Sequence, residues 1–187
     1  DFPILNEQVH GKKLVYLDNA DTTQKPQVVI DAIIEAYSKW NANVHRGVHH
    51  LSQVATQNHE EARKKVAELI HAQSEDEIIF TKGTTDGINM LARSFGDAMV
   101  SEGDEIIVSQ LEHHSNIVPW QMLCERKKAV LKVIPLREDL SLDIEAFEGL
   151  LSKRTRLVSV AQVSNVLGIV NPIEEIVRLA HEKGVAV

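Results

Sequence analysis

Short, continuous apolar runs alternate along this chain with segments whose apolar residues recur at helical spacing, and this alternation limits the possible folds more than any other feature. Ile106-Ile107-Val108 is one such run, and Ile173, Ile176 and Ala180 show the helical spacing. Runs that are apolar throughout are typical of strands buried on both faces. The predicted fold class is therefore α/β, with a mostly parallel sheet covered by helices on both faces.

The same patterns predict approximate bounds for each element. The predicted strands are residues 14–17, 78–80, 105–109, 130–134 and 157–161, with a further strand starting near residue 184. The predicted helices are residues 29–37, 62–70, 88–98, 118–126, 143–151 and 172–180, and a loop over residues 41–56 enters the second of them. Asp143 is suited to cap the fifth helix, and Gly184 is suited to end the last one.

The composition excludes several classes of protein. The chain has 187 residues, a formal net charge of −7 and one cysteine, Cys124, which excludes a disulfide framework and a cysteine-rich zinc site. No apolar stretch reaches the roughly 18 residues of a membrane span. No basic run is present that would suit nucleic acid or an anionic membrane. We expect a cytoplasmic protein with neither nucleic acid nor a membrane as partner.

Both ends of the chain suggest a piece of a longer protein. The chain begins with Asp1 rather than Met, and it ends inside the apolar run Val185-Ala186-Val187. Chain termini are normally polar and frayed. We therefore expect residues 1–20 to lead into a domain of which residues 21–187 are the first part. A natural end with a short final strand is the alternative.

A helix N-terminus is predicted just after residues 78–80. Gly83 precedes Thr84 and Thr85, so a close backbone approach, two hydroxyls and the free N–H groups of the helix coincide there. A phosphate group fits these donors. The segment is neither a Walker loop nor a dinucleotide-binding glycine pattern. The alternative is that a threonine simply caps the helix.

Two further polar positions follow predicted strands. His113 and His114 come after residues 105–109, beside Glu112, and an imidazole can both stack as a flat ring and move a proton near neutral pH. Asn165 follows residues 157–161, where its amide can donate a hydrogen bond to an oxyanion. The alternatives are a pair of surface histidines and an ordinary turn residue.

The segment His45-Arg46-Gly47-Val48-His49-His50 is a third polar cluster. His45 and His49 are four residues apart, but no third ligand follows at a zinc spacing, so we predict no metal site. Arg46 is suited to clamp an anion or a carboxylate. Cys124 is predicted to be buried and inert.

The polar positions after the strands suit one kind of ligand. Ligands of parallel sheets bind at the carboxyl ends of the strands. The phosphate-binding donors at the predicted helix N-terminus, a stacking imidazole and an amide donor at that edge suit a flat, phosphorylated ring. Pyridoxal phosphate has the phosphate, the aromatic ring and the phenolate oxygen that these groups would bind.

The sequence also resembles the group II (SufS-type) cysteine desulfurases, also called selenocysteine lyases. The matching segments run in family order over nearly the whole chain. They are Tyr16-Leu17-Asp18-Asn19-Ala20, Gln24-Lys25-Pro26, Val44-His45-Arg46-Gly47-Val48-His49, Gly83-Thr84-Thr85-Asp86-Gly87-Ile88-Asn89, Glu112-His113-His114-Ser115-Asn116-Ile117-Val118-Pro119-Trp120 and Val163-Ser164-Asn165-Val166-Leu167-Gly168. The His-Arg-Gly element and the double histidine separate this group from the related NifS/IscS group.

This resemblance implies roles for the matching residues. Thr84 and Thr85 would bind the phosphate of pyridoxal phosphate. His113 would stack on the cofactor ring and act as the catalytic residue that assists proton transfer, and Asn165 would bind the phenolate oxygen. The substrate-binding residues implied in the same way are Asn19, Ala20, His45, Arg46 and Asn165.

The resemblance also implies an activity and partners. The family fold is that of type I pyridoxal-phosphate enzymes, which are homodimers. They remove sulfur from L-cysteine, or selenium from L-selenocysteine, leaving L-alanine and an enzyme persulfide whose sulfur passes to an acceptor protein of iron–sulfur cluster assembly. The alternatives are another type I enzyme, such as a kynureninase or an aminotransferase, and a non-catalytic fragment.

Two parts of the family's machinery have no counterpart here. The chain contains no Ser-x-His-Lys motif, which carries the family's aldimine lysine, and Cys124 does not stand in the context of the nucleophilic cysteine. We therefore expect residues 21–187 to be the N-terminal part of a large cofactor-binding domain, truncated before that lysine. The chain alone should bind the cofactor weakly, if at all, and should be inactive.

Overall fold

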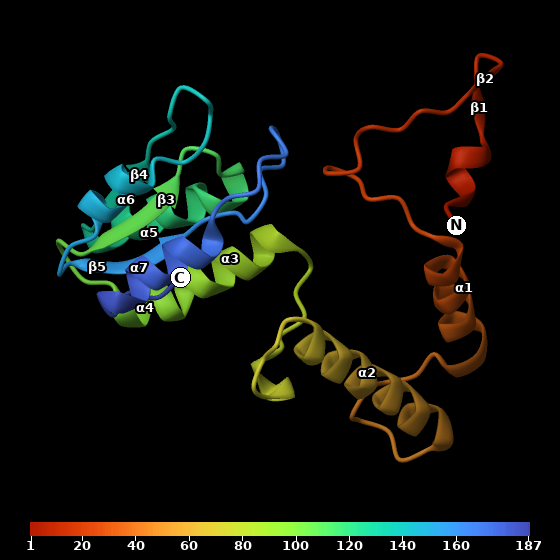
Figure 1. The fold of residues 1–187 in the computed structure, drawn as a ribbon. Coiled ribbons are helices and arrows are strands. Elements are labelled where there is room, and N and C mark those ends of the chain that lie inside the picture. The colour runs from red at the N-terminus through yellow and green to blue at the C-terminus, as the bar shows by residue number, and fades with distance from the viewer. The chain divides into compact units, whose positions relative to one another are not determined.

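The computed structural model describes residues 1–187, which form two compact units, residues 1–80 and residues 81–187 (Figure 1). Each unit has its own secondary structure and its own packing. None of the helices is both long enough and apolar enough to cross a bilayer.

The second unit is built on a three-stranded parallel sheet with the strand order β4-β3-β5. The strands are β3 (Glu105–Ser109), β4 (Val130–Ile134) and β5 (Thr155–Ser159). The helices around the sheet are α3 (Thr84–Arg93), α4 (Phe95–Met99), the 3-10 turn η4 (His114–Asn116), α5 (Val118–Lys127), α6 (Ile144–Leu150) and α7 (Ile173–Glu182). The predicted α/β class with a parallel sheet is confirmed.

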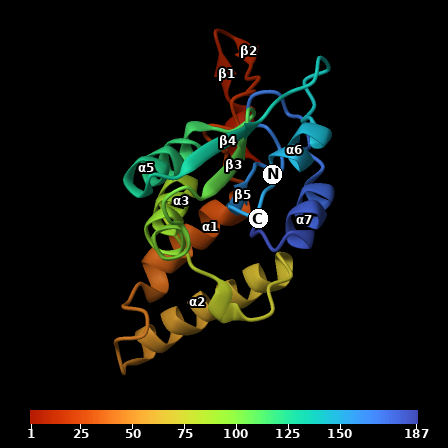
Figure 2. The same ribbon diagram turned by 90° about the vertical axis from the view of Figure 1, so that its left-hand side faces the viewer.

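Helices cover both faces of this sheet, with α3 and α5 on one side and α6 and α7 on the other (Figure 2). Ile106 and Val108 of β3 pack in one core cluster with Trp120 of α5. Ile107 points to the opposite face and packs in a second cluster with Phe147 of α6. All residues of β3 are buried, which explains why its three central residues, 106–108, are apolar on both faces.

The first unit is mainly helical. Its helices are α1 (Gln27–Glu35), which continues into the π-helical turn η2 (Ala36–Trp40), and α2 (His50–Leu69). It also contains the 3-10 turns η1 (Pro3–Asn6) and η3 (Glu75–Glu77) and an antiparallel hairpin of β1 (Gln8–Val9) and β2 (Lys12–Lys13). The helices predicted over residues 29–37 and 62–70 are confirmed, and α2 begins well before the second of these ranges.

Two of the predicted strands are wrong. Residues 14–17 and 78–80 form no strand, and the side chains of Leu17 and Phe80 are 91% and 49% exposed. A strand persists only where its N–H and C=O groups pair with a neighbour, and these segments have none. The strands over 105–109 and 130–134 are confirmed, and the one predicted over 157–161 lies two residues earlier, at Thr155–Ser159. Near the C-terminus only Ala186 pairs, in an isolated parallel bridge to Leu157.

Glu105 is a carboxylate only 2% exposed at the amino end of β3. Its Oε2 atom lies 2.8 Å from Lys132 Nζ of β4 and accepts a hydrogen bond from Ser152 Oγ at 2.6 Å. Its Oε1 atom lies 3.2 Å from Arg154 Nη2. Burial raises the pKa of Glu105, but the hydrogen bonds from Lys132 and Ser152 outweigh burial and lower it to about 2. The carboxylate therefore links β3 to β4 on one side and to the loop before β5 on the other.

We predict that Glu105 makes the stability of the chain sensitive to acid. Its pKa falls from an ordinary value of 4.5 to about 2 on folding, so its contribution is complete above pH 4.5 and is lost as the pH falls towards 2. At pH 6, urea denaturation should give Glu105→Gln a free energy of unfolding about 3 kcal/mol below that of the wild type. This difference should shrink towards zero near pH 2. The exposed Glu102→Gln is the control, and a difference for Glu105→Gln that is constant with pH would contradict the prediction.

Candidate functional site

The N-terminus of α3 is open, and no side chain caps it. Gly83 is the N-cap residue with a φ of +152°, a conformation that favours glycine, and the first helical hydrogen bond runs from Gly87 N to Gly83 O. Thr84 and Thr85 are exposed, and their hydroxyls make no hydrogen bond within the chain. The alternative in which a threonine caps this helix is therefore wrong, and both hydroxyls and the first N–H groups are available to a ligand.

His113 lies between β3 and η4 and is exposed. Its Nδ1 atom accepts a hydrogen bond from Ser115 N at 3.2 Å and lies 3.0 Å from Ser115 Oγ. A ring nitrogen that accepts from a backbone N–H carries no proton, so the neutral imidazole of His113 holds its proton on Nε2. The ring meets His114 edge-on, with the ring centroids 6.0 Å apart. Nε2 is thus the atom of His113 that presents a hydrogen-bond donor to a ligand.

Asn165 lies in a tight turn after β5. Ser164 builds this turn, because its Oγ accepts a hydrogen bond from Leu167 N at 3.2 Å and its carbonyl accepts one from Gly168 N at 2.9 Å. Gly168 has a φ of +69°, which the turn requires. The Asn165 side chain is exposed and makes no hydrogen bond within the chain. Its amide is therefore free to bind a ligand.

The strand order brings these segments to one edge of the sheet. β3 and β5 are parallel neighbours, so the loops that carry His113 and Asn165 leave the sheet at the same carboxyl edge. α3, which begins with Thr84, contacts η4, which directly follows His113. The predicted residues of the second unit are thus carried by elements that adjoin one another.

A polar network that the sequence reasoning missed joins the same loops. Asn116 Nδ2 donates to Glu112 Oε2 at 2.7 Å, and Asn116 Oδ1 accepts from Trp120 Nε1 at 2.9 Å. Glu112 Oε1 also accepts from Ala161 N at 2.9 Å, and Asn116 Oδ1 accepts from Ser159 Oγ at 2.6 Å. The regular spacing of Glu112, Asn116 and Trp120 was the available signal. No signal in the sequence indicated the contacts that Glu112 and Asn116 make with β5 and the loop after it.

In the first unit, the loop that carries His45 and Arg46 is fastened to α2. Ser52 Oγ donates to Asn43 O at 2.6 Å and accepts from Gly47 N at 3.0 Å. A Cβ atom at Gly47 would lie 2.6 Å from the Ser52 side chain, so only glycine fits there. The result is a rigid loop on which Arg46 is exposed.

Three ligating side chains meet beside this loop. Ligand atoms of His45, His59 and Glu60 all lie within 4.8 Å of one another, and His45 Nε2 is 2.9 Å from Glu60 Oε1. The Arg63 guanidinium lies 3.2 Å from His59 Nε2 and 3.3 Å from Glu60 Oε2. Glu60 is therefore paired with Arg63 as well as with His45, and the cluster is a network of ion pairs and hydrogen bonds.

Asn19 and Ala20 lie in an exposed turn of the first unit. Asn19 Oδ1 accepts a hydrogen bond from Gln24 N at 2.8 Å, and Asn19 O accepts one from Thr23 Oγ1 at 2.9 Å. The Asn19 side chain is therefore used to hold its own turn, and its amide nitrogen is the group left for a ligand.

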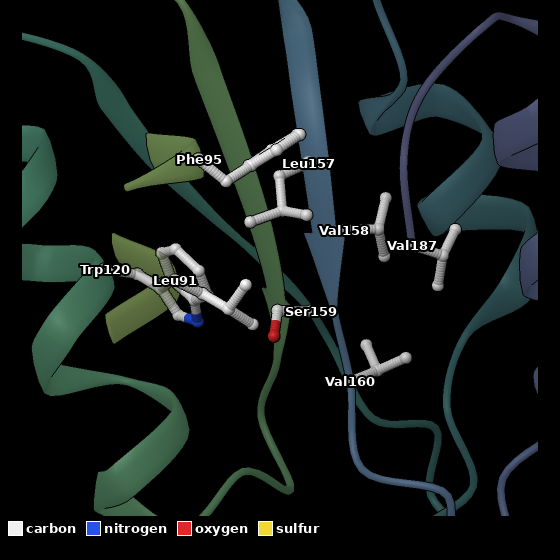
Figure 3. A pocket seen from close by; sticks show the side chains of 8 residues that line it. All are labelled: Leu91, Phe95, Trp120, Leu157, Val158, Ser159, Val160 and Val187. Carbon is white, nitrogen blue, oxygen red and sulfur yellow. The ribbon is translucent and has the colours of Figure 1, made fainter. Parts of the chain in front are cut away.

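An apolar pocket of about 280 Å³ lies elsewhere in the second unit (Figure 3). Its lining residues are Leu91, Phe95, Trp120, Leu157, Val158, Ser159, Val160 and Val187. None of the predicted site residues lines it, and it contains no titratable side chain. Cys124 is buried as predicted, and burial raises the pKa of its thiol to about 11, so it is a poor nucleophile at neutral pH.

The fold and the polar edge of the sheet define an α/β protein with the architecture of type I pyridoxal-phosphate enzymes, of which the chain holds a part. The chain belongs to the aminotransferase class-V family, whose model matches residues 15–187.

Within this family, the chain is similar to proteins named cysteine desulfurase. The cysteine desulfurase of Enterobacter sp. (strain 638) is 52% identical over 187 residues, which are 100% of this chain and 46% of that protein. The apo structure of a cysteine desulfurase from Thermococcus onnurineus NA1 matches with a TM-score of 0.90 and 39% identity, over 99% of this chain and 44% of that one. The structure of the cysteine desulfurase CsdA from Escherichia coli matches with a TM-score of 0.81 and 37% identity, over 92% of this chain and 43% of that one. The resemblance to cysteine desulfurases is confirmed, and the chain spans about half the length of these relatives.

We predict that Ser52→Ala loosens the loop that presents Arg46. The variant loses the hydrogen bonds to Asn43 and Gly47, and a local loss of about 1 kcal/mol should speed tryptic cleavage after Arg46 about fivefold. Ser38→Ala is the matched control, because the Ser38 hydroxyl bonds only to carbonyls of its own helical segment. Equal cleavage rates in the wild type and both variants would show that Ser52 does not hold the loop.

Proposed function

We propose that this chain is part of a pyridoxal-phosphate-dependent cysteine desulfurase that removes sulfur from L-cysteine. The observation that carries the proposal is the set of unbonded ligand groups on adjoining elements of the second unit, namely the Thr84 and Thr85 hydroxyls, His113 Nε2 and the Asn165 amide. The sequence identity of 52% and 49% to proteins named cysteine desulfurase and probable cysteine desulfurase, over 100% and 98% of this chain, supports it.

The donor set fits the cofactor. A phosphate at the N-terminus of α3 would accept hydrogen bonds from Thr84, Thr85 and backbone N–H groups, and the helix dipole favours its negative charge. Gly83 leaves the space in front of that helix open, since a Cβ there would meet nothing within 4 Å. The His113 ring would stack on the pyridine ring, and Asn165 would donate to the phenolate oxygen. When bound, pyridoxal phosphate withdraws electrons from the substrate Cα.

His113 is the catalytic residue of this proposal. Its Nε2 carries the proton in the neutral ring, and Ser115 N holds Nδ1 in the unprotonated state. In its neutral form His113 therefore presents a hydrogen-bond donor to a ligand. As a general acid it would give up the Nε2 proton from the doubly protonated ring, in which Nδ1–H would donate to Ser115 Oγ, and the neutral ring that remains would accept a proton at Nε2.

The substrate would be L-cysteine or L-selenocysteine. Arg46, on its rigid loop, has the planar donor pair that binds a carboxylate. Asn19, Ala20, His45 and Asn165 are the further substrate-binding residues of the proposal. The reaction breaks the bond between Cβ and sulfur, transfers the sulfur to an enzyme cysteine as a persulfide, and releases L-alanine.

The wider setting belongs to the same proposal. The complete enzyme would act as a cytoplasmic homodimer and would pass its sulfur to an acceptor protein of iron–sulfur cluster assembly. Residues 1–20 would lead into the large cofactor-binding domain, to which residues 21–187 contribute. The chain alone would be inactive, because it contains no Ser-x-His-Lys motif and its one cysteine, Cys124, is buried.

We predict that His113→Ala, in the complete enzyme that contains this sequence, lowers the rate of L-alanine and sulfide formation from L-cysteine under reducing conditions by a hundredfold or more, roughly the contribution of a general acid–base group. His114→Ala is the matched control, as an exposed neighbour of the same type, and should retain activity. Equal activity of the two variants would contradict the role of His113. Formation of a keto acid, or cleavage of kynurenine, in place of desulfuration would contradict the proposed function.

We predict that the 187-residue chain mixed with pyridoxal phosphate gives no stable visible absorption band of a lysine-bound cofactor. The motif that carries the family's lysine is absent from it, so only weak, phosphate-directed binding remains. A visible-range titration checks this, with free lysine at equal concentration as the control. A stable band that borohydride fixes to one lysine of the chain would overturn the expectation of inactivity.

A further inference from the structure

The Glu112 carboxylate lies between the loop that carries His113 and the loop that leads to Asn165. Both of its oxygens are occupied. Oε1 accepts from Ser109 Oγ at 2.5 Å and from Ala161 N at 2.9 Å, and Oε2 accepts from Asn116 Nδ2 at 2.7 Å and from Ala161 N at 3.1 Å. A carboxylate whose oxygens are held in this way is poorly placed to act as a general base, but it fixes the groups that donate to it.

Asn116 extends the same connection. Its side chain is 8% exposed, and it also donates to Ser159 O at 3.2 Å while accepting from Trp120 Nε1 and Ser159 Oγ. Both the amide nitrogen and the amide oxygen are therefore satisfied. A fully satisfied buried network holds its members in one arrangement, because every alternative leaves a buried group unpaired.

The peptide groups of Ala161 are held from both sides. Glu112 accepts from its N–H, and Asn171 Nδ2 donates to its carbonyl at 2.7 Å. Asn171 is 4% exposed and also donates from its backbone N to Gln162 O at 2.8 Å. Ala161 is therefore the fixed base from which the turn containing Asn165 projects.

We propose that Glu112 is a positioning residue that sets the separation between His113 and Asn165, and so aligns the ring-stacking and phenolate-binding groups of the cofactor site. The inference rests on the proposed function for its ligand. Glu112 directly precedes His113, and its bond to Ala161 N crosses 49 positions of sequence. Neutral donors supply all of these hydrogen bonds, so the two loops are held together without a cationic side chain.

Glu112→Gln tests this role because it keeps the shape of the side chain and removes two acceptor sites. Ala161 N donates to both carboxylate oxygens of Glu112, at 2.9 and 3.1 Å, so the amide NH₂ of the glutamine takes away one of its two acceptors in either orientation. Hydrogen exchange of the 187-residue chain should become about tenfold faster over residues 161–168, as expected for the loss of a hydrogen bond to a charged group. In the complete enzyme, the dissociation constant for pyridoxal phosphate, measured by absorbance, should rise about tenfold.

Two further variants separate positioning from general destabilisation. Glu125→Gln, exposed on α5, should change neither readout. Ser159→Ala removes one bond of the network but leaves the link from Glu112 to Ala161, so it should lower the urea midpoint without weakening cofactor binding. If Glu112→Gln does not fold, Ser109→Ala, which removes one donor to Glu112, should shift both readouts in the same direction by a smaller factor.

The outcomes distinguish this inference from the proposed function. Unchanged exchange and unchanged cofactor affinity in Glu112→Gln would overturn the positioning role while leaving the function intact. Weaker cofactor binding in Ser159→Ala equal to that in Glu112→Gln would also overturn it, because destabilisation alone would then explain the loss. A wild-type enzyme that binds no pyridoxal phosphate would overturn the function, whereas faster exchange in Glu112→Gln would still establish the link between the loops.

Discussion

The parallel pairing of β3 with a neighbour on each side is the constraint on which the second unit depends. Every residue of β3 is at most 2% exposed, because β4 and β5 cover its edges and helices cover its faces. The loop after β3 therefore emerges in the middle of the carboxyl edge, directly beside the loop after β5. Residues as distant in sequence as His113 and Asn165 are brought to one edge by strand order.

Much of this fold could be predicted because its local signals agree with its tertiary structure. Residues 106–108 are apolar on both faces since both faces are buried, and Asp143 caps α6 as predicted by accepting from Ala146 N at 3.0 Å. Residues 14–17 and 78–80 carry the same apolar signal without forming strands. Strand formation needs a partner elsewhere in the chain, and apolar composition cannot report whether that partner exists.

Some residues of the candidate site could likewise be predicted from the sequence, and others could not. Thr84, His113 and Asn165 could be singled out because each follows a predicted strand in a pattern of glycine, imidazole or amide. The network of Glu112 and Asn116 could not, because its partners near β5 lie 43 to 49 positions further along the chain. Side chains that project from a site carry a local signal, whereas side chains that hold a site together depend on contacts that only the folded chain contains.

The two carboxylates near the ends of β3 show how one charge type serves two purposes. Glu105 pairs at the amino end with the cationic groups of Lys132 and Arg154. Burial raises its pKa, but the hydrogen bonds from Lys132 and Ser152 outweigh burial and lower it to about 2, which links its ionisation to folding. Glu112, just past the carboxyl end, is held by hydroxyl, amide and backbone N–H donors, none of them charged. These neutral donors connect the loop that carries His113 to the loop that leads to Asn165 without any cationic side chain.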